Sequence, residues 1–456
     1  MLADQVAVLA ADEARRLVHA CAGMADHGRD GVLGALERAA QRSGAAIGLA
    51  VLAAVVDHTA AHPPARTACP CPGHRGADAR LVARRPKTVR TLLGPLPVVR
   101  GYYHCRTCEH GFAPVDDLLG VAGTRLSPGM ARACATAGAE MPYDRSRQLI
   151  ATVTGLDLAS TSTITRTTRT HGRRARALEA TEHGTPPPPT TPAHDHHRPD
   201  KCYVLIDGTG APMLPSECRD RQGKDGRKAT TREVKIGCLF TQTHTDPATG
   251  APVQDPGSAT YVSTFDPCGP FGDLVKAEYL RRGLDHVRQP VVIGDGAHWI
   301  WAIADTHFPA ATQVVDYYHA REHLADLVKL LTPLLCDPAT FETTLADLLD
   351  LGHTNHIAAA VAALDLPTTA PDLAKAATTE VGYFTGNHHR MQYADFRANG
   401  YYIGSGPVES ACNTIVKQRA KRAGMHWTIT GLDPVLALRT THQSGRDHIL
   451  WPEPQT

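Results

Sequence analysis

The sequence predicts a multidomain α+β protein. Three observations support this fold class: apolar residues recur at helical spacing near the N-terminus, two cysteine turns flank a strand-like segment, and from Lys201 onward short apolar runs alternate with helical segments. A chain of 456 residues can hold two to four domains with sizeable cores. Its formal net charge of +1 neither favours nor excludes a polyanionic partner.

The sequence predicts no membrane or secretory segment. Residues 1–24 are amphipathic and carry acids and arginines, unlike a signal peptide, which begins with basic residues and has an apolar centre. The most apolar stretch, residues 45–56, is shorter than the roughly 20 residues that span a bilayer, so we expect it to be a core helix. Most of the 12 cysteines are scattered singly, as in reduced cytosolic proteins. A cytoplasmic protein with no membrane partner is therefore expected.

Two cysteine turns predict a structural zinc site. The first turn is Cys69-Pro-Cys-Pro-Gly-His74, and the second is Cys105-Arg-Thr-Cys108. The segment between them alternates apolar and polar residues, as a strand does, and contains a Gly-Pro turn. This is the pattern of a zinc ribbon, whose four ligands leave no open position for chemistry. In the first turn either Cys71 and His74 or Cys69 and Cys71 can bind. We prefer Cys71 with His74 because their spacing matches the second turn; four reduced thiols without metal are the alternative.

The next region has helix-turn-helix spacing. Residues 143–154 predict one helix, Gly155 begins a turn, and residues 160–171 predict a second helix with Ser160 as its N-cap. Any helical hairpin with an arginine-rich end has the same pattern, so a solvated surface is the alternative to DNA contact. The candidate DNA-binding residues are Thr161, Ser162, Thr165, Arg166, Arg169, Arg173 and Arg174.

Three carboxylates predict a divalent metal site. An apolar run at 203–206 ends in Asp207-Gly208, and a second run at 291–293 leads to Asp295. Glu409 follows Pro407, a residue suited to the first turn of a helix. Two strand-end aspartates and one helix-borne glutamate form the hard oxygen set that Mg²⁺ or Mn²⁺ prefers. The alternative is that these acids only cap turns and helices.

The order of elements around these carboxylates predicts a ribonuclease H-like domain. Three strands, a helix, a strand, a helix and a strand follow one another between residues 202 and 318. In that fold the carboxylates of the first and fourth strands lie side by side, and the third comes from a later helix. Residues 324–380 have a helical pattern and predict an all-α insertion. Basic residues that suit a polyanionic substrate continue the Glu409 helix: Lys417, Arg419, Lys421 and Arg422.

These patterns divide the chain into five regions and a tail. They are N-terminal helices (1–62), a zinc-ribbon-like module (65–122), a helix-turn-helix region (123–178), a Pro-, Thr- and His-rich linker (179–200), a ribonuclease H-like domain (201–445) with a helical insertion at about 324–395, and a tail (446–456).

At these residues the chain resembles bacterial insertion-sequence transposases of the Kra type, relatives of the Mutator-like DDE transposases. The resemblance covers roughly residues 65–445 and rests on the paired cysteine turns together with six motifs, which are specific only in combination. The motifs are Asp207-Gly-Thr, Glu233-Val-Lys235, Asp295-Gly-Ala-His-Trp299, Asp316-Tyr-Tyr-His319, Gly404-Ser-Gly-Pro-Val-Glu409 and Met425-His-Trp427. The irregular first cysteine turn is the main departure from the family.

The resemblance implies a function. Asp207, Asp295 and Glu409 would be the catalytic triad that binds Mg²⁺ or Mn²⁺, with Asp316 and His319 close to the active centre. The substrates would be double-stranded DNA at the terminal inverted repeats and at the target, in the bacterial cytoplasm near the nucleoid, and the active form would be a homodimer or larger. Two rivals remain: a nuclease of the same fold that cuts without joining, and a DNA-binding regulator without activity.

Overall fold

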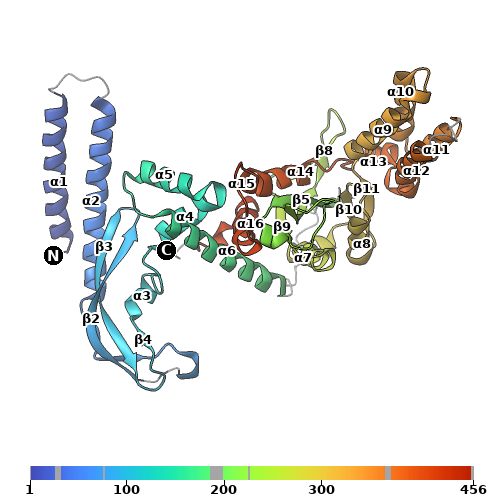
Figure 1. The fold of residues 1–456 in the computed structure, drawn as a ribbon. Helices are drawn as coiled ribbons and strands as arrows, with labels where there is room; N and C mark the ends of the chain where they lie inside the picture. Colours follow the sequence, from blue (N-terminus) through green and yellow to red (C-terminus); the bar gives the residue numbers. More distant parts are fainter. Residues whose placement is uncertain are drawn as a thin grey trace. The chain divides into compact units, whose positions relative to one another are not determined.

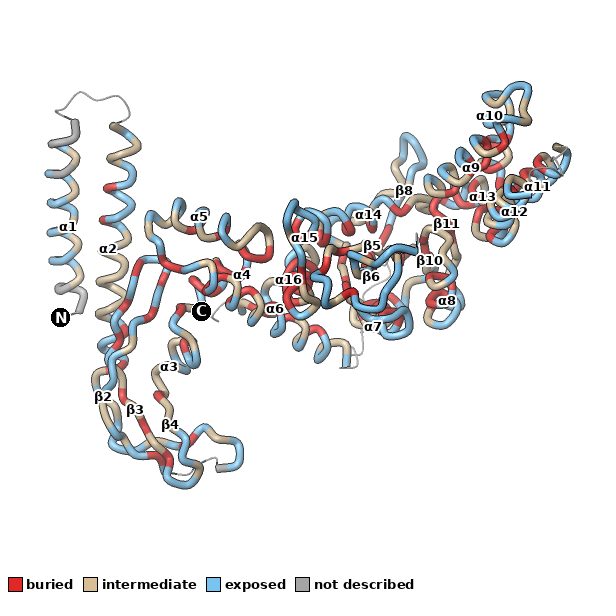
Figure 2. Tube along the Cα trace, in the orientation of Figure 1, coloured by how far each residue is buried: buried red, intermediate tan, exposed pale blue. Residues whose placement is uncertain are grey.

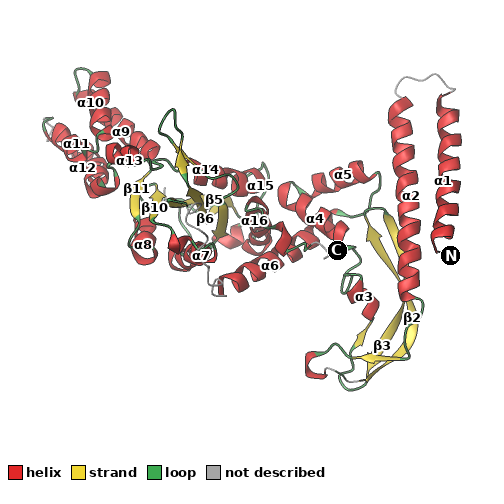
Figure 3. Ribbon diagram, turned by 180° about the vertical axis from the view of Figure 1, so that it is seen from behind, coloured by secondary structure: helices red, strands yellow, loops and turns green. Residues whose placement is uncertain are grey.

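The computed structural model describes residues 2–25, 32–74, 76, 78–184, 199–223, 226–364 and 371–452. The chain forms two compact units, Met1–Thr170 and His171–Thr456. Figure 1 shows the course of the chain, and Figure 3 shows which elements are helices and which are strands. Helices accompany a mixed five-stranded sheet, so the predicted α+β class is confirmed.

The first unit combines helices with a four-stranded antiparallel sheet of order β1-β2-β3-β4. Its elements are α1 (Leu2–Ala25), α2 (Val32–Ala60), β1 (Arg66–Ala68), β2 (Asp78–Thr91), β3 (Gly94–Cys105), β4 (Gly111–Phe112), α3 (Pro114–Leu118), α4 (Pro128–Glu140), α5 (Tyr143–Thr154) and the start of α6 (Thr161–Gly184). The long β2–β3 hairpin occupies the segment between the two cysteine turns.

Helix α2 is longer than the apolar segment suggested. Within the described residues it is the one helix that could cross a membrane by length and composition, which is weak evidence by itself. Its C-terminal part packs on the hairpin, where Val56 lies in a cluster with Val89 and Val98. Only 17% of its most apolar window is buried, as Figure 2 shows along the helix, so the expectation of a core helix holds only for this part.

Helix α6 begins as predicted and ends later than predicted. The Ser160 hydroxyl accepts a hydrogen bond from the Thr163 backbone N–H at 3.2 Å, which confirms the N-cap. The helix continues to Gly184 instead of stopping near residue 171, so residues 179–184 of the predicted linker are helical. Arg173 and Arg174 therefore lie on this helix and not in a segment after it. Residues 185–198 of the predicted linker lie outside the described residues.

The second unit is built on a five-stranded sheet of order β11-β10-β5-β6-β9. Its strands are β5 (Lys201–Pro212), β6 (Thr231–Gln242), β9 (Thr260–Thr264), β10 (Gln289–Gly294) and β11 (Thr312–Val315), with a small β7–β8 hairpin (His244–Thr245, Pro252–Val253) before β9. Strands β10 and β11 run parallel to β5, and β6 and β9 complete an antiparallel meander. The predicted succession of strands and helices is present. The last strand ends at Val315 and not at 318, because Asp316 caps the next helix.

Helices cover both faces of this sheet. The core helices are α7 (Cys268–Arg281), α8 (His298–His307), α14 (Gly406–Ala411), the π-helical turn η6 (Cys412–Lys417), α15 (Gln418–Ala420) and α16 (Ile429–Gln443). Gly237 pairs with Ile206, and a Cβ atom on Gly237 would lie 3.0 Å from Val275 of α7, so α7 covers that face. Asp207 is the next residue of β5 and points to the opposite face, where α14 and η6 contact the strand.

The expected all-α insertion follows β11. It consists of α9 (Tyr317–Leu331), α10 (Pro338–Asp350), α11 (Thr354–Ala362), α12 (Pro371–Gly386) and α13 (Tyr393–Ala398), with residues 365–370 outside the description. Figure 3 shows helices joined by loops, and no strand, among the described residues of this part. Residues 446–452 of the predicted tail also pack within this unit: Leu450 is buried, and the ring of Trp451 lies 4.5 Å from that of His171.

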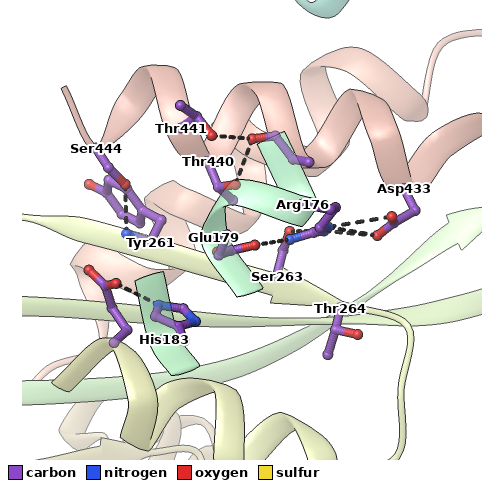
Figure 4. Close-up of polar contacts among 12 residues, drawn as sticks. Arg176, Glu179, His183, Tyr261, Ser263, Thr264, Asp433, Thr440, Thr441 and Ser444 are labelled. Atoms are coloured by element: carbon purple, nitrogen blue, oxygen red, sulfur yellow. Dashed lines mark hydrogen bonds and ion pairs between the residues drawn. The ribbon is translucent and has the colours of Figure 1, made fainter. Parts of the chain in front are cut away.

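A buried ion cluster fixes the second half of α6 to the sheet (Figure 4). Arg176 donates to Asp433 of α16 at 2.8 Å, to Glu179 at 3.0 Å and to the Ser263 hydroxyl of β9 at 3.1 Å. Burial works against the charge of Arg176, but Glu179 and Asp433 outweigh it and raise its pKa. The arginine therefore has a structural role in this unit.

Replacing Asp433 with Ala should destabilise the second unit. The change leaves Arg176 with one carboxylate partner, and we expect a loss of roughly 2 kcal/mol because the cluster is mostly buried. All four tryptophans lie beyond residue 298, so urea unfolding followed by tryptophan fluorescence reports on this unit. The matched control is Asp350→Ala, whose ion pair with Arg397 is about 42% exposed on both sides and should contribute less than about 1 kcal/mol. Equal effects of the two changes would contradict the assignment.

Candidate functional site

Strand pairing brings two of the predicted carboxylates together. Strands β5 and β10 are parallel, and their register pairs Val204 with Val292 and Leu205 with Ile293. Extending that register by two residues sets Asp295 beside Asp207. Strand β5 does not stop at Asp207 as predicted but runs on to Pro212, paired with β6. Because β10 ends at Gly294, Asp207 lies where one edge of β5 becomes free.

The third carboxylate reaches the same place from helix α14. Glu409 lies in the first turn of this helix, as predicted, and is exposed. Three residues later Cys412 donates a hydrogen bond from its thiol to Asp207 Oδ2 at 3.2 Å. Positions three apart share one face of a helix, so this contact directs the face that carries Glu409 toward β5.

Electrostatics shows that the three carboxylates influence one another. Burial raises the pKa of Asp207, and the negative charges of Asp295 and Glu409 raise it further. Hydrogen bonds from Cys412 and from the Gly208 backbone N–H (2.6 Å) oppose this shift without reversing it. A bound cation would relieve the repulsion, because an opposite charge favours the ionised carboxylates. The donor set therefore fits a divalent metal.

Asp316 holds the segment that carries Glu409. Its side chain is fully buried and caps α9 by accepting from the His319 backbone N–H at 2.7 Å. The other carboxylate oxygen accepts from the Ser405 backbone N–H, and the Ser405 hydroxyl donates to Glu409 at 2.8 Å. Asp316 therefore acts on the triad through Ser405. No contact links it directly to Asp207 or Asp295 among the described residues.

His319 contacts side chains of α9 and α12. Its Nδ1 lies 3.4 Å from Glu322, and its ring meets that of His323 at 5.0 Å. His323 in turn is hydrogen-bonded to Glu380 at 2.8 Å and stacks on Tyr383 at 3.9 Å. The sequence-based expectation places His319 close to the active centre. Its ring also lies 6.5 Å from that of Tyr383, whose hydroxyl donates to the Asp295 backbone carbonyl.

Tyr383 connects the helical insertion to the Asp295 turn. Its hydroxyl donates to the Asp295 backbone carbonyl at 3.0 Å, and burial raises its pKa, so the hydroxyl stays protonated. Its ring lies 2.6 Å from where a Cβ of Gly296 would be, and Gly296 has φ of +99°. Only glycine fits this backbone. The Asp295 side chain accepts from the Ala297 backbone N–H at 2.9 Å, which fixes its orientation.

The Glu233-Val-Lys235 motif lies on β6, which pairs with β5, the strand that carries Asp207. Lys235 donates to Glu233 at 2.8 Å, and a Cβ on Gly208 would lie 2.5 Å from Glu233 Oε1. Gly208 therefore lets the Glu233 side chain cross β5 directly next to Asp207. Lys235 also lies 5.6 Å from the ring of Trp299.

Of the four basic residues after Glu409, three are exposed and one is not. Lys421 donates to the Thr209 hydroxyl at 3.2 Å, two residues from Asp207, and its pKa is lowered first by desolvation and then by the charge of nearby Lys417. Arg422 is exposed. Arg419 is fully buried, with its guanidinium 4.8 Å from the Trp427 ring. The prediction that Arg419 contacts DNA is wrong, because its side chain is fully buried.

The predicted DNA-binding residues of α6 lie on one continuous helix. Ser162, Arg166, Arg173 and Arg174 are exposed, whereas Thr161, Thr165 and Arg169 are half-buried. The Thr165 hydroxyl bonds to the Thr161 backbone carbonyl at 2.8 Å. The four exposed residues are accessible to a partner. Their contact with DNA stays a prediction.

Three cysteines gather at one end of the β2–β3 hairpin. The sulfur atoms of Cys69, Cys105 and Cys108 lie within 4.8 Å of one another, and those of Cys69 and Cys108 are 3.6 Å apart. Sulfurs around a tetrahedral zinc ion stand roughly 3.8 Å apart. The preferred first-turn ligand Cys71 is not in this group and is replaced by Cys69, the alternative. The side chain of His74 lies outside the described residues.

The second turn has the geometry of a metal-binding knuckle. Backbone N–H groups of Cys108 and Thr107 point at the Cys105 sulfur and lower its pKa to about 7. The His110 backbone N–H favours the Cys108 thiolate, but burial and the neighbouring sulfurs outweigh it and raise the pKa of Cys108 to about 11. Sulfurs that repel one another as thiolates are stabilised by a shared cation. This Cys₃ cluster can bind a structural metal such as zinc.

Three residues of the site escaped the sequence analysis. Cys412 could have been found, because it lies three positions after Glu409 on the same helical face. Ser405 stands inside a motif that was noted, but its role depends on the capping geometry of Asp316. No sequence pattern could have identified Tyr383, because it lies 88 residues from Asp295 and only the fold brings the two together.

Comparisons with known proteins add little. No protein family and no curated protein match the sequence. Among solved structures the chain has a distant likeness to a Drosophila P element transposase strand transfer complex, at 10% identity and a TM-score of 0.24, covering 71% of this chain and 81% of that one. A likeness at this level carries no conclusion about fold or activity.

The cysteine cluster yields a test by metal content. The purified chain should contain about one zinc per molecule, and Cys69→Ser or Cys105→Ser should remove it, because each variant leaves only two of the three clustered cysteines. Cys268→Ser, an exposed cysteine outside the cluster, is the control and should leave zinc unchanged. The measurement is elemental analysis after gel filtration. Zinc retained in both cluster variants would contradict the site.

Proposed function

We propose that this protein is a DDE transposase on a ribonuclease H-like catalytic domain, which cleaves DNA at the ends of an insertion sequence and joins it to a target. The observation that carries the proposal is the meeting of Asp207, Asp295 and Glu409 from β5, β10 and α14. The sheet order β11-β10-β5-β6-β9, with its last three strands antiparallel, supports the fold assignment.

The chemistry follows from the residues present. Two divalent ions, Mg²⁺ or Mn²⁺, bound by the three carboxylates would activate a water or a 3′-hydroxyl and stabilise the leaving oxygen at a scissile phosphate. Asp207 and Asp295 are oriented by the backbone N–H groups of Gly208 and Ala297. Ser405 orients Glu409. Lys417 and Lys421 supply positive charge beside the site, where they can neutralise phosphate oxygens.

The sequence motifs support transposition over its rivals. The arginines of α6 and the zinc module give the chain DNA-binding elements besides the carboxylate site, which a simple nuclease does not need. Cutting both ends of an element requires a paired complex, so we expect a homodimer or larger assembly that acts on DNA in the bacterial cytoplasm. A nuclease that cuts without joining remains the second candidate, because the same three carboxylates serve hydrolysis.

Replacing Glu409 with Gln should abolish cleavage. The change keeps the Ser405 contact available but removes a negative charge that would hold the metal. Because a bound metal contributes on the order of several kcal/mol to transition-state stabilisation, the cleavage rate should fall more than about 100-fold. The assay follows a labelled duplex carrying the element end with Mg²⁺ or Mn²⁺. Asp273→Asn, whose side chain is 78% exposed, is the control. If the native protein binds the duplex and never cuts it, the regulator becomes the better account. Nicks without joined products favour the nuclease.

Replacing Tyr383 with Phe should slow cleavage without weakening DNA binding. The ring stays, and the hydrogen bond to the Asp295 carbonyl is lost, so the turn that orients Asp295 loosens. Changes of this kind cost about 10- to 100-fold in metal affinity or activity. We expect a lower rate at saturating DNA, a higher Mn²⁺ requirement and an unchanged dissociation constant for DNA. Tyr318→Phe, on an exposed side chain, is the control. A weakened affinity for DNA with an unchanged rate would contradict this positioning role.

A further inference from the structure

Two adjacent hollows in the first unit are lined by cationic side chains. One, of about 470 Å³, is lined by Lys87, Arg90, Gly123, Thr124, Arg125, Leu126, Thr163, Arg166 and Thr167. The other, of about 820 Å³, is lined by residues 157–163 together with Arg90, Pro95 and Arg147. Arg90 and Thr163 line both, so the hollows form one groove, hereafter the hairpin groove. It lies between the end of β2, the loop before α4 and the start of α6.

Backbone hydrogen bonds fix the two walls of this groove. The Arg90 N–H donates to the Arg125 carbonyl at 2.7 Å, and the Ser127 N–H donates to the Arg90 carbonyl at 3.0 Å. This short parallel bridge ties the loop before α4 to strand β2. The Ser127 hydroxyl then caps α4 by accepting from Met130 at 3.2 Å. Arg90 and Arg125 are therefore held side by side by the fold and not by a partner.

Only some of the cationic side chains of the hairpin groove are neutralised by ion pairs. Within the described residues, no ion pair involves the exposed arginines Arg90, Arg125 and Arg166. Lys87 differs, since it donates to Asp116 at 2.9 Å and to the Val121 carbonyl at 2.6 Å. Asp116 also binds Arg100; burial opposes its ionisation, but the two cations outweigh burial and lower its pKa.

One acid borders the groove and is already neutralised. Asp157 lines the larger hollow and accepts from Arg147 Nε at 3.1 Å. The smaller hollow has no acidic side chain among its lining residues. Three unpaired guanidinium groups around a polar hollow, with threonine hydroxyls nearby, suit phosphate oxygens, because arginine binds them in a bidentate way.

We propose that the hairpin groove binds the sugar-phosphate backbone of duplex DNA beside helix α6. Arg90 and Arg125, from the β2 strand and the loop before α4, would hold phosphates, while Ser162 and Arg166 on the exposed side of α6 face the neighbouring base edges. The β2–β3 hairpin, which carries the cysteine cluster, and the helical pair would then act as one DNA-binding surface. The inference rests on the proposed function only in taking DNA as the partner.

Duplex DNA fits better than duplex RNA for a geometric reason. The major groove of B-form DNA admits an α-helix, whereas the major groove of A-form RNA is too narrow for side chains to read. The arginines of the hairpin groove flank the first two turns of α6. A DNA backbone held by them would therefore border the major groove that α6 enters. RNA binding at the same residues is thus an outcome that would overturn the choice of partner.

The test measures binding of the full-length chain to a labelled random-sequence duplex by fluorescence anisotropy over a range of NaCl concentrations. Arg90→Gln combined with Arg125→Gln removes two phosphate contacts. The affinity should fall at least on the order of tenfold, and the slope of log affinity against log salt should shrink by about 2. The matched control, Arg38→Gln combined with Arg132→Gln, removes two exposed charges outside the groove and should change affinity less than about twofold.

The outcomes separate this inference from the proposed function. Equal affinities for the groove variant and the control variant overturn the groove, even if the protein cleaves DNA with Mn²⁺. A weakened groove variant in a protein that never cleaves DNA supports the groove and removes the transposase assignment. Tighter binding of duplex RNA than of DNA, lost in the same variant, overturns DNA as the partner.

Discussion

The candidate active site depends on the parallel pairing of β5 with β10. The register that sets Leu205 beside Ile293 also sets Asp207 beside Asp295, and a slip of one residue would turn one of the carboxylates to the other face of the sheet. Both strands are buried in the largest core cluster of the chain, which strongly specifies that register. The energy that fixes the positions of the carboxylates therefore comes largely from the packing of apolar residues in the sheet core.

Placing like charges together has an electrostatic cost, and the surroundings of the site are organised around it. Burial and the neighbouring carboxylates raise the pKa of Asp207, while a thiol and a backbone N–H counter the shift. Asp316 fixes the Glu409 segment through Ser405, and Tyr383 fixes the Asp295 turn from the helical insertion. The insertion thus does more than separate β11 from α14 in the sequence: it contributes the residue that supports one side of the site.

The sequence predicted those elements that local residue patterns determine. The apolar runs before Asp207 and Asp295 predicted the strands, Ser160 predicted the start of α6, and the alternation of patterns predicted the succession of strands and helices along the chain. It could not reveal that β5 continues past Asp207, because that extension depends on pairing with β6, or that α6 continues to Gly184, where partners such as Asp433 support it. In the sequence Arg419 resembles its basic neighbours, but the fold buries it beside the Trp427 ring. The choice between Cys69 and Cys71 depended on how the first turn folds onto the hairpin.

The central claim is that Asp207, Asp295 and Glu409 form one divalent metal site. Crystals of the chain soaked in MnCl₂ would test it most directly, because manganese has an anomalous X-ray signal that locates it without reference to activity. The account predicts one or two anomalous peaks bounded by these three carboxylates, and none there in crystals of the Asp207→Asn variant. Manganese bound elsewhere, with no peak among the three carboxylates of the native protein, would contradict the account.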